Sequence, residues 1–292
     1  MINLIVEQIL NGLLTGSMYV MMALGFSLIW GIIGVFNFAH GAMYMLGAYI
    51  SFTLITWGLN ASLSISIMMV LMFILGVLIE RFCIRPFSAY RGTSSYVMNC
   101  VIVTLALAIA IETAVLLIYG GEFKTVNSFA PGVVVLGDFQ ISNQMFYSFV
   151  IGILSIVAIA LFIKYTRIGL AMRALAQEPI AASMTGLNPN AIYSITFGIS
   201  SALAGLAGAL LAPVYSIYPS VGWVSFLYAF IVVILGGLGS MTGVVAAGFL
   251  VGIIKNVGTI WLSGQWIMAI IFGFLILVLF IRPRGLFGTR VG

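Results

Sequence analysis

Charged residues are scarce in this sequence of 292 residues. Asp, Glu, Lys and Arg together make up 6% of the chain, whereas roughly 25% of the residues of an average soluble protein are charged. Hydrophobic residues make up 63%, and the mean hydropathy is +1.26. A soluble domain cannot be built from this composition, so we expect a membrane protein that works in or beside the bilayer.

Residue types that carry catalysis or metal binding are also scarce. The sequence has one histidine and two cysteines, Cys83 and Cys100, without a CxxC spacing, so neither a disulfide framework nor a metal site is indicated. No GxxxxGK[ST] phosphate loop, HExxH motif or GxSxG motif occurs. We therefore expect a chain that is not an enzyme and binds no cofactor of its own.

Long apolar runs account for nearly the whole chain. A helix needs about 20 apolar residues to cross the hydrocarbon core. We predict helices at residues 5–33, 35–57, 61–82, 95–119, 144–163, 191–213, 223–238, 243–258 and 267–281. The sequence thus predicts an all-α, polytopic membrane protein with eight or nine transmembrane spans, forming a single transmembrane domain over residues 1–292. The first run lacks a basic start and a small-residue cleavage site, so we expect it to be retained.

Basic residues gather in three loops, after the third, fifth and last predicted helices. They are Arg81, Arg85 and Arg91, then Lys164, Arg167 and Arg173, and finally Arg282, Arg284 and Arg290. Lys and Arg are enriched in cytoplasmic loops, so this pattern indicates a multi-pass protein of a bacterial inner membrane with a cytoplasmic C-terminus. The net charge of +5 reflects these loops and does not indicate nucleic-acid binding.

The same rule places residues 120–143 outside, as a periplasmic loop. Turn signals at 131–132 and 137–138 flank the apolar residues 133–136, which predicts a small hairpin. Three crossings before Arg81 put Met1 outside, whereas merging or re-entry of the second segment puts it inside. We favour the outside.

Two glycine-rich segments interrupt the apolar runs. Residues 34–41 read GVFNFAHG and residues 236–243 read GGLGSMTG, each with glycines seven residues apart. Unwound backbone at membrane depth persists only where protein or water satisfies its polar groups, and paired interruptions point to a transport path. We therefore expect two broken or re-entrant segments. The alternative is that these glycines merely allow helices to pack closely.

Polar residues inside the predicted spans are candidates for a translocation path. Asn37, His40 and Tyr44 share one face if the segment after Val35 is helical. Glu112 is the one acid well inside a predicted span, and it either faces the path or reaches toward the outer interface. His40, the only histidine, either contacts the solute or bonds a neighbouring helix. We assign the following residues to the path: Asn37, His40, Gly41, Tyr44, Glu112, Gly236, Gly239 and Gly243.

An amphipathic loop, residues 164–190, separates the fifth and sixth predicted helices. Its apolar side chains lie on one face of each of two short helices that part at Pro179, namely Leu170 and Ala174, then Ile180, Ala181 and Met184. A cytoplasmic pair of this kind needs a partner surface.

Within this loop, Ala181-Ala182 followed by Gly186 resembles the EAA loop of ABC importer permeases, with Ile180 where that motif has Glu. The surrounding string is similar to the coupling loop of the branched-chain amino acid permease family, the LivH-type subunit. Other segments are also similar to that family: 23–29, 37–41 together with 46–49, 235–240 and 282–288. These landmarks span almost the whole chain.

The resemblance implies the permease subunit of an ABC importer, forming half of the translocation path for branched-chain amino acids or a related small polar solute. Urea or a short amide is the alternative cargo. A second permease, LivM-type or another copy, completes the pore; a periplasmic binding protein delivers the solute. Two cytoplasmic ATPase subunits carry ATP and Mg. They would dock on Arg173, Gln177, Glu178, Ala181, Ala182 and Gly186.

Two competing interpretations fit the sequence less well. A secondary transporter or channel usually places acids near the midplane, where this chain offers only Glu112, and it would leave the loop at 164–190 without a purpose. An intramembrane enzyme acting through His40 or Glu112 would need a nucleophile or metal nearby, and no motif supplies one.

Overall fold

The fold is almost entirely helical, as the sequence predicts. The computed structural model describes residues 1–136 and 139–288, apart from the side chains of Ile2, Ala89, 135, 136 and 139–141, so Asp138 and Arg290 lie outside the described residues. The helices are α1 (Ile2–Ile33), α2 (His40–Thr56), α3 (Ala61–Ile79), α4 (Ser94–Tyr119), α5 (Asn143–Tyr165), α6 (Arg167–Gln177), α7 (Pro179–Met184), α8 (Pro189–Leu211), α9 (Val221–Gly236), α10 (Met241–Gly258) and α11 (Gly264–Ile281). Two short helical segments, η1 (Glu80–Ile84) and η2 (Arg85–Tyr90), continue α3.

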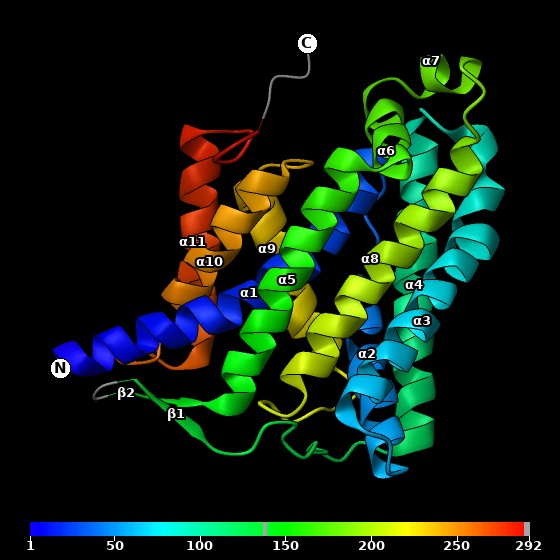
Figure 1. Cartoon of the computed structure of the whole chain (residues 1–292). Coiled ribbons are helices and arrows are strands. Elements are labelled where there is room, and N and C mark those ends of the chain that lie inside the picture. Colours follow the sequence, from blue (N-terminus) through cyan, green and yellow to red (C-terminus); the bar gives the residue numbers. More distant parts are fainter. Residues whose placement is uncertain (137–138, 289–292) are drawn as a thin grey trace.

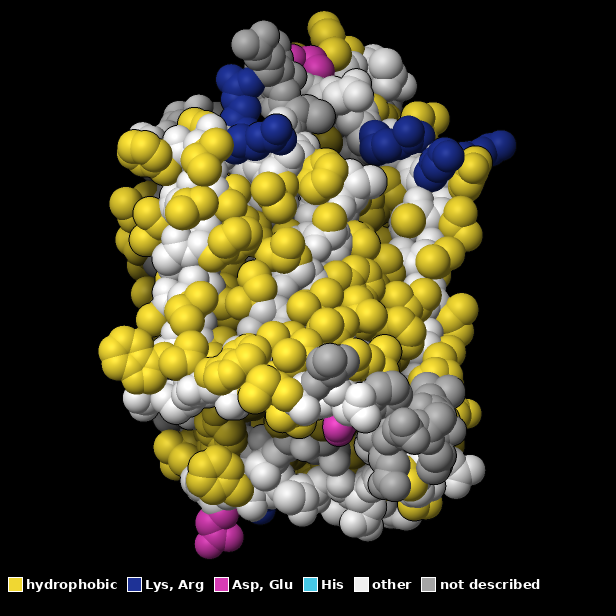
Figure 2. Space-filling view, turned by 90° about the vertical axis from the view of Figure 1, so that its left-hand side faces the viewer, with side chains coloured by type: hydrophobic (Ala, Val, Ile, Leu, Met, Phe, Trp, Pro, Cys, Tyr) yellow, Lys and Arg dark blue, Asp and Glu magenta, His cyan; other side chains and the backbone are white. Residues whose placement is uncertain are grey.

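The helices run between two ends of the bundle (Figure 1). One end carries the N-terminus and a β-hairpin, and we name it the hairpin end. The other carries α6, α7 and the C-terminal segment, and we name it the loop end. Figure 2 shows one face of the bundle, with hydrophobic side chains covering the belt between the two ends and Lys and Arg gathered at the loop end. Because lipid tails offer no hydrogen bonds, this belt suits the hydrocarbon core.

Seven helices in the described part of the chain are long and apolar enough to cross a membrane, namely α1, α3, α4, α5, α8, α10 and α11. The helices α2 and α9 are shorter, at 17 and 16 residues. The expected total of eight or nine spans therefore depends on how these two are counted.

The first three segments cross the bundle in alternating directions. The end of α1 lies at the loop end, where Ile32 and Arg173 line one cavity. Residues 34–56 return to the hairpin end, where Thr53 bonds Tyr119 at 2.6 Å, and α3 then rises again. The N-terminus consequently lies at the end opposite to Arg85, as three crossings before Arg81 require.

The centre of the bundle is formed by α1 and α8. Their apolar stretches are 83% and 89% buried, whereas those of α3, α4, α5 and α11 are only 17–28% buried. The outer helices can therefore face lipid or a second membrane subunit, while α1 and α8 contact protein on nearly all sides.

Glycines let the central helices approach backbone to backbone. Gly47 of α2 lies against the backbone of Gly205 in α8, and Gly12 of α1 lies against Gly252 of α10. Inside a bilayer there is no hydrophobic drive between helices, so close packing of small residues supplies the attraction. Gly205 and Gly208 thus make α8 a packing surface for its neighbours.

The first interrupted segment is a real break between two helices. α1 ends at Gly34, whose φ of 74° suits glycine, and residues 35–39 are not helical. Thr104 of α4 satisfies part of this backbone, because its Oγ1 accepts from Phe38 N and donates to Phe36 O, at 3.1 and 3.4 Å. The predicted helix 35–57 was therefore wrong at its start, and Asn37 does not share a helical face with His40 and Tyr44.

The second interrupted segment is a tight turn that joins α9 to α10 at the loop end. Gly237 and Gly239 have φ of 102° and 81°, and the Ser240 hydroxyl caps α10 through Gly243 N at 3.2 Å. The C-terminal segment packs on this turn, since Leu286 N donates to Leu235 O at 2.8 Å. The glycines therefore allow a tight turn and let the C-terminal segment pack on it.

The predicted hairpin is confirmed. β1 (Val133–Leu136) pairs antiparallel with β2 (Phe139–Ser142). The preceding segment is fastened to the bundle, because Lys124 and Ile217 pair as an isolated bridge and Gln144 Oε1 accepts from Phe129 N at 2.8 Å.

Candidate translocation path and coupling loop

His40 ties three helices together in the centre of the bundle. The side chain is fully buried. Its Nε2 lies 2.9 Å from Met22 O of α1, so this nitrogen donates, and its Nδ1 lies 3.5 Å from Ser200 Oγ of α8. Ser200 in turn donates to Gly25 O at 2.8 Å. Both ring nitrogens therefore meet protein atoms, which is the structural alternative raised for this residue.

Asn37 shapes the break that leads into α2. The side chain is 1% exposed, and its Oδ1 accepts from Ala39 N at 3.1 Å. Its carbonyl accepts from His40 N at 3.1 Å. The residue thus sets the turn from which α2 starts, and it reaches the interior of the bundle without facing one of the larger cavities described below.

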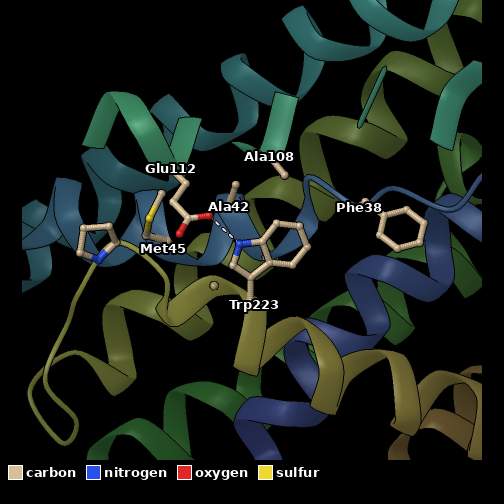
Figure 3. Close-up of a pocket in the computed structure, with 9 residues that line it drawn as sticks. Phe38, Ala42, Met45, Ala108, Glu112 and Trp223 are labelled. Atoms are coloured by element: carbon tan, nitrogen blue, oxygen red, sulfur yellow. Dashed lines mark hydrogen bonds between the residues drawn. The ribbon is translucent and has the colours of Figure 1, made fainter. Parts of the chain in front are cut away.

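A narrow pocket lies where α2, α4 and α9 meet (Figure 3). Gly41 of α2 packs against the backbone of Gly222 in α9, and Trp223 Nε1 donates to Glu112 Oε2 of α4 at 2.5 Å. The pocket has a volume of about 10 Å³, which is room for about one water molecule. Gly41 and Glu112 are therefore brought together, in a contact that is closed to an amino acid in this conformation.

Tyr44 faces a larger space. It lines a cavity of about 270 Å³ between α1, α2, α9 and α10, together with Tyr19 and Lys255. The side chain of Tyr44 is 6% exposed. Tyr44 is only three residues from Gly41, but it lies on another side of the α2–α9 contact.

The glycines assigned to the path in the second segment lie elsewhere, at the loop end. Gly236 and Gly243 meet backbone to backbone across the turn. Gly239 lines a cavity of about 210 Å³ with Arg173 of α6 and Gly31 of α1. The predicted path residues thus occupy five places, and the last of them connects the turn after α9 with the loop that carries α6.

The two expected loop helices, parted at Pro179, are confirmed as α6 and α7. α6 packs on the bundle through Met172 and Leu175, both buried, whereas Leu170 is 60% exposed. The apolar face of α6 that was predicted from Leu170 is therefore not the face that packs on the bundle. Gly169 brings a different face of α6 against the backbone of Ile163.

The end of the loop is open. Ile180 and Met184 are 72% and 84% exposed, and their four-residue spacing puts both side chains on one face of α7. Of the six residues assigned to ATPase docking, Ala182 is buried, whereas Arg173, Gln177, Glu178, Ala181 and Gly186 are exposed. Gly186 has a φ of 86° with no atom near a hypothetical Cβ.

A buried ion pair beside the loop was missed by the sequence analysis. Glu80, 0% exposed, accepts from Arg85 Nη2 at 2.7 Å and from Ser194 Oγ at 2.6 Å. Arg85 also donates to Asn190 O at 3.3 Å. The first turns of α8, directly after the loop, are thereby fixed to the end of α3. The spacing of Glu80 and Arg85 at the end of a predicted span was the available signal.

Lys255 is the second feature that was missed. It lies inside α10, a predicted span, and is half-buried. An ionisable residue in such a segment is itself a signal of function. The described part of the chain has no group of three or more His, Cys, Asp and Glu side chains that could hold a metal ion.

Known proteins resemble this chain over almost its whole length. Residues 8–280 match a family described as "Branched-chain amino acid transport system / permease component". The chain is 34% identical to the high-affinity branched-chain amino acid transport system permease protein BraD of Pseudomonas aeruginosa, over 97% of this chain and 95% of BraD. It is 31% identical to the corresponding protein LivH of Escherichia coli, over 97% and 95%. It is 29% identical to Escherichia coli LivM, over 50% of this chain and 35% of LivM. No solved structure matches the chain.

Proposed function

This chain belongs to the branched-chain amino acid transport permease family and is the permease component of an ABC importer, and from this premise we propose that its own solute is a branched-chain amino acid. The observation that carries the proposal is the end-to-end similarity to BraD and LivH, whose names state this solute. Fold alone would not suffice, since one fold serves many solutes.

A second permease completes the pore in this proposal. The half-length similarity to LivM supports a LivM-type partner, and a second copy of this chain is the alternative. The exposed lipid-facing helices offer room for such a partner: Leu117 of α4 and Phe280 of α11 are 81% and 91% exposed.

Two ATPase subunits dock at the loop end, and they alone carry ATP and Mg. The exposed apolar side chains of Ile180 and Met184 supply an anchor, and Arg173, Gln177 and Glu178 supply a polar rim, as is usual for protein interfaces. A periplasmic binding protein delivers the solute at the hairpin end.

The chain lies in the inner membrane with its loop end, and therefore its C-terminus, in the cytoplasm. The basic side chains at the loop end (Figure 2) support this orientation through the preference of Lys and Arg for cytoplasmic loops.

Closure of the ATPases moves the loop, and the contacts of α6 transmit this motion. Arg173 shares a cavity with Gly31 and Gly239, so a shift of α6 reaches both the end of α1 and the turn before α10. The break at residues 34–39 follows directly, and it is a natural hinge because its backbone is not fixed in a helix. Its movement would open the closed contact between Gly41 and Gly222.

The test is solute uptake in cells that lack their own transport of leucine, isoleucine, valine and urea. The chain is produced with the permease, ATPase and binding-protein subunits of its own genome. We expect saturable uptake of radiolabelled leucine that stops when this chain is omitted or ATP is depleted. Uptake of urea without leucine would overturn the assignment of the solute, and uptake without any ATPase subunit would overturn the assignment to an ABC importer.

A further inference from the structure

The cavity that Tyr44 lines has the features of a binding site. It has a volume of about 270 Å³, somewhat below the roughly 300–1,000 Å³ of pockets for drug-sized ligands, so it suits a solute the size of one amino acid. Its rim reaches the surface, since Tyr215 and Val224 are 42% and 45% exposed. Ile217, which pairs with Lys124 in the segment before the hairpin, places this rim near the hairpin end.

Lys255 lies inside the cavity among aromatic side chains. Its Nζ donates to the Tyr19 hydroxyl at 2.5 Å and lies 5.2, 5.3 and 5.1 Å from the ring centroids of Tyr19, Tyr215 and Tyr228. An ammonium has three N–H donors, so two remain for other partners. The tyrosine rings hold the cation in place without neutralising it.

No carboxylate in the described part of the chain forms an ion pair with Lys255. The ion pair among these residues joins Arg85 to Glu80. It lies at the loop end, whereas Lys255 lies in the half of α10 that is near the hairpin end. A cation kept in a membrane-spanning helix without such a partner marks a functional site by default.

The direction of Lys255 does not fit a lysine that merely reaches for lipid headgroups. It stands three residues before Gly258, the last residue of α10, and helical side chains lean toward the N-terminus of their helix. Its side chain accordingly leads into the bundle and ends on Tyr19, which is 6% exposed and belongs to the central helix α1.

We propose that Lys255 and the tyrosines around it bind the carboxylate group of the transported amino acid at the hairpin-end half of this chain, an inference that rests on the proposed function. The two free N–H donors of Lys255 would meet the carboxylate, because charge-assisted hydrogen bonds are the stronger ones. The hydroxyl of Ser225, which also lines the cavity, would accept from the amino group, while Leu211 and Val221 give an apolar wall for an aliphatic side chain.

The experiment measures leucine uptake by the complete transporter in proteoliposomes, with the binding protein saturated with leucine. Lys255→Met keeps the length of the side chain and removes its charge, Lys255→Arg keeps the charge, and Lys124→Met is the control on another lysine near the hairpin end. We expect Lys255→Met to lower the uptake rate about 10-fold to 100-fold, the range for loss of a hydrogen bond to a charged group. Lys255→Arg should retain most of the rate, and Lys124→Met should equal wild type.

ATP hydrolysis stimulated by the loaded binding protein separates this role from a structural one, because it should stay near the wild-type rate in Lys255→Met. Where that variant fails to insert, Tyr215→Leu at the exposed rim replaces it, with about a 10-fold loss expected from the lost aromatic face. Wild-type uptake in both variants overturns the inference, and so does a Lys255→Met defect that appears only in vesicles containing anionic lipid, which would assign Lys255 to a lipid phosphate. Absence of leucine uptake in the wild type would instead overturn the proposed function.

Discussion

Replacement of Gly47 by alanine tests whether backbone contact between α2 and α8 holds the centre of the bundle. A Cβ atom at position 47 would overlap the Cα and carbonyl of Gly205, and neither can rotate away as a side chain would. Overpacking that side chains can absorb costs about 1–3 kcal/mol, so this backbone overlap belongs at the upper end, about 3 kcal/mol. The intrinsic helix preference of alanine over glycine returns about 1 kcal/mol.

Gly273→Ala is the matched control for this substitution. Gly273 also lies inside a helix, α11, but no atom lies within 4 Å of a Cβ built there. The same gain in helix preference applies, so Gly273→Ala should be neutral or stabilising by up to about 1 kcal/mol. Gly47→Ala should destabilise the chain by about 2 kcal/mol, the difference between the overlap cost and this gain.

The assay follows the loss of folded protein during denaturation with SDS in mixed micelles, for both variants and wild type. The midpoint should fall for Gly47→Ala and stay or rise for Gly273→Ala. Equal midpoints for the two variants would show that α2 and α8 are not held in backbone contact.

Three further substitutions test the break before α2, the Glu80–Arg85 ion pair and the docking surface on α7. Asn37→Leu removes the hydrogen bond to Ala39 N, which is comparable to a helix cap worth about 1 kcal/mol. The amount of this variant in the membrane should be normal, and leucine uptake should be reduced. Unchanged uptake kinetics would show that the break at residues 34–39 is only a packing feature. Glu80→Ala should cost about 2 kcal/mol, less than the roughly 3–5 kcal/mol of a fully buried pair, because Arg85 is 30% exposed; a denaturation midpoint equal to wild type would contradict this. Ile180→Asp should leave the midpoint unchanged, since exposed substitutions stay within about 0.5 kcal/mol, and should reduce co-purification of the ATPase; full co-purification would remove α7 from the docking surface.

The sequence predicted the helices well where a composition signal was strong. Apolar runs of about 20 residues identify spans, and the turn residues around 133–136 identified the hairpin that β1 and β2 form. The start of α2 was predicted wrongly, because residues 35–39 are as apolar as a helix. The left-handed Gly34 and the bonds from Thr104 decide that stretch, and Thr104 lies 66 residues from Phe38 along the chain.

The candidate path was only partly accessible from the sequence for a related reason. Spacing on one helix cannot show that Glu112 meets Trp223 of α9 or that His40 meets Met22 and Ser200, since these contacts depend on how helices cross. Lys255 was passed over because the basic residues were read for orientation alone. Its aromatic surroundings come from α1, α9 and the segment after α8.

The most direct measurement of the central claim is the number of leucine molecules imported per ATP hydrolysed, in proteoliposomes that contain this chain, a second permease, two ATPase subunits and the leucine-loaded binding protein. We expect leucine to accumulate against its gradient, with a fixed ratio to ATP hydrolysis that is lost when this chain is left out. Leucine entering at the same rate without ATP, or ATP hydrolysis without any leucine uptake in the wild-type complex, would contradict it.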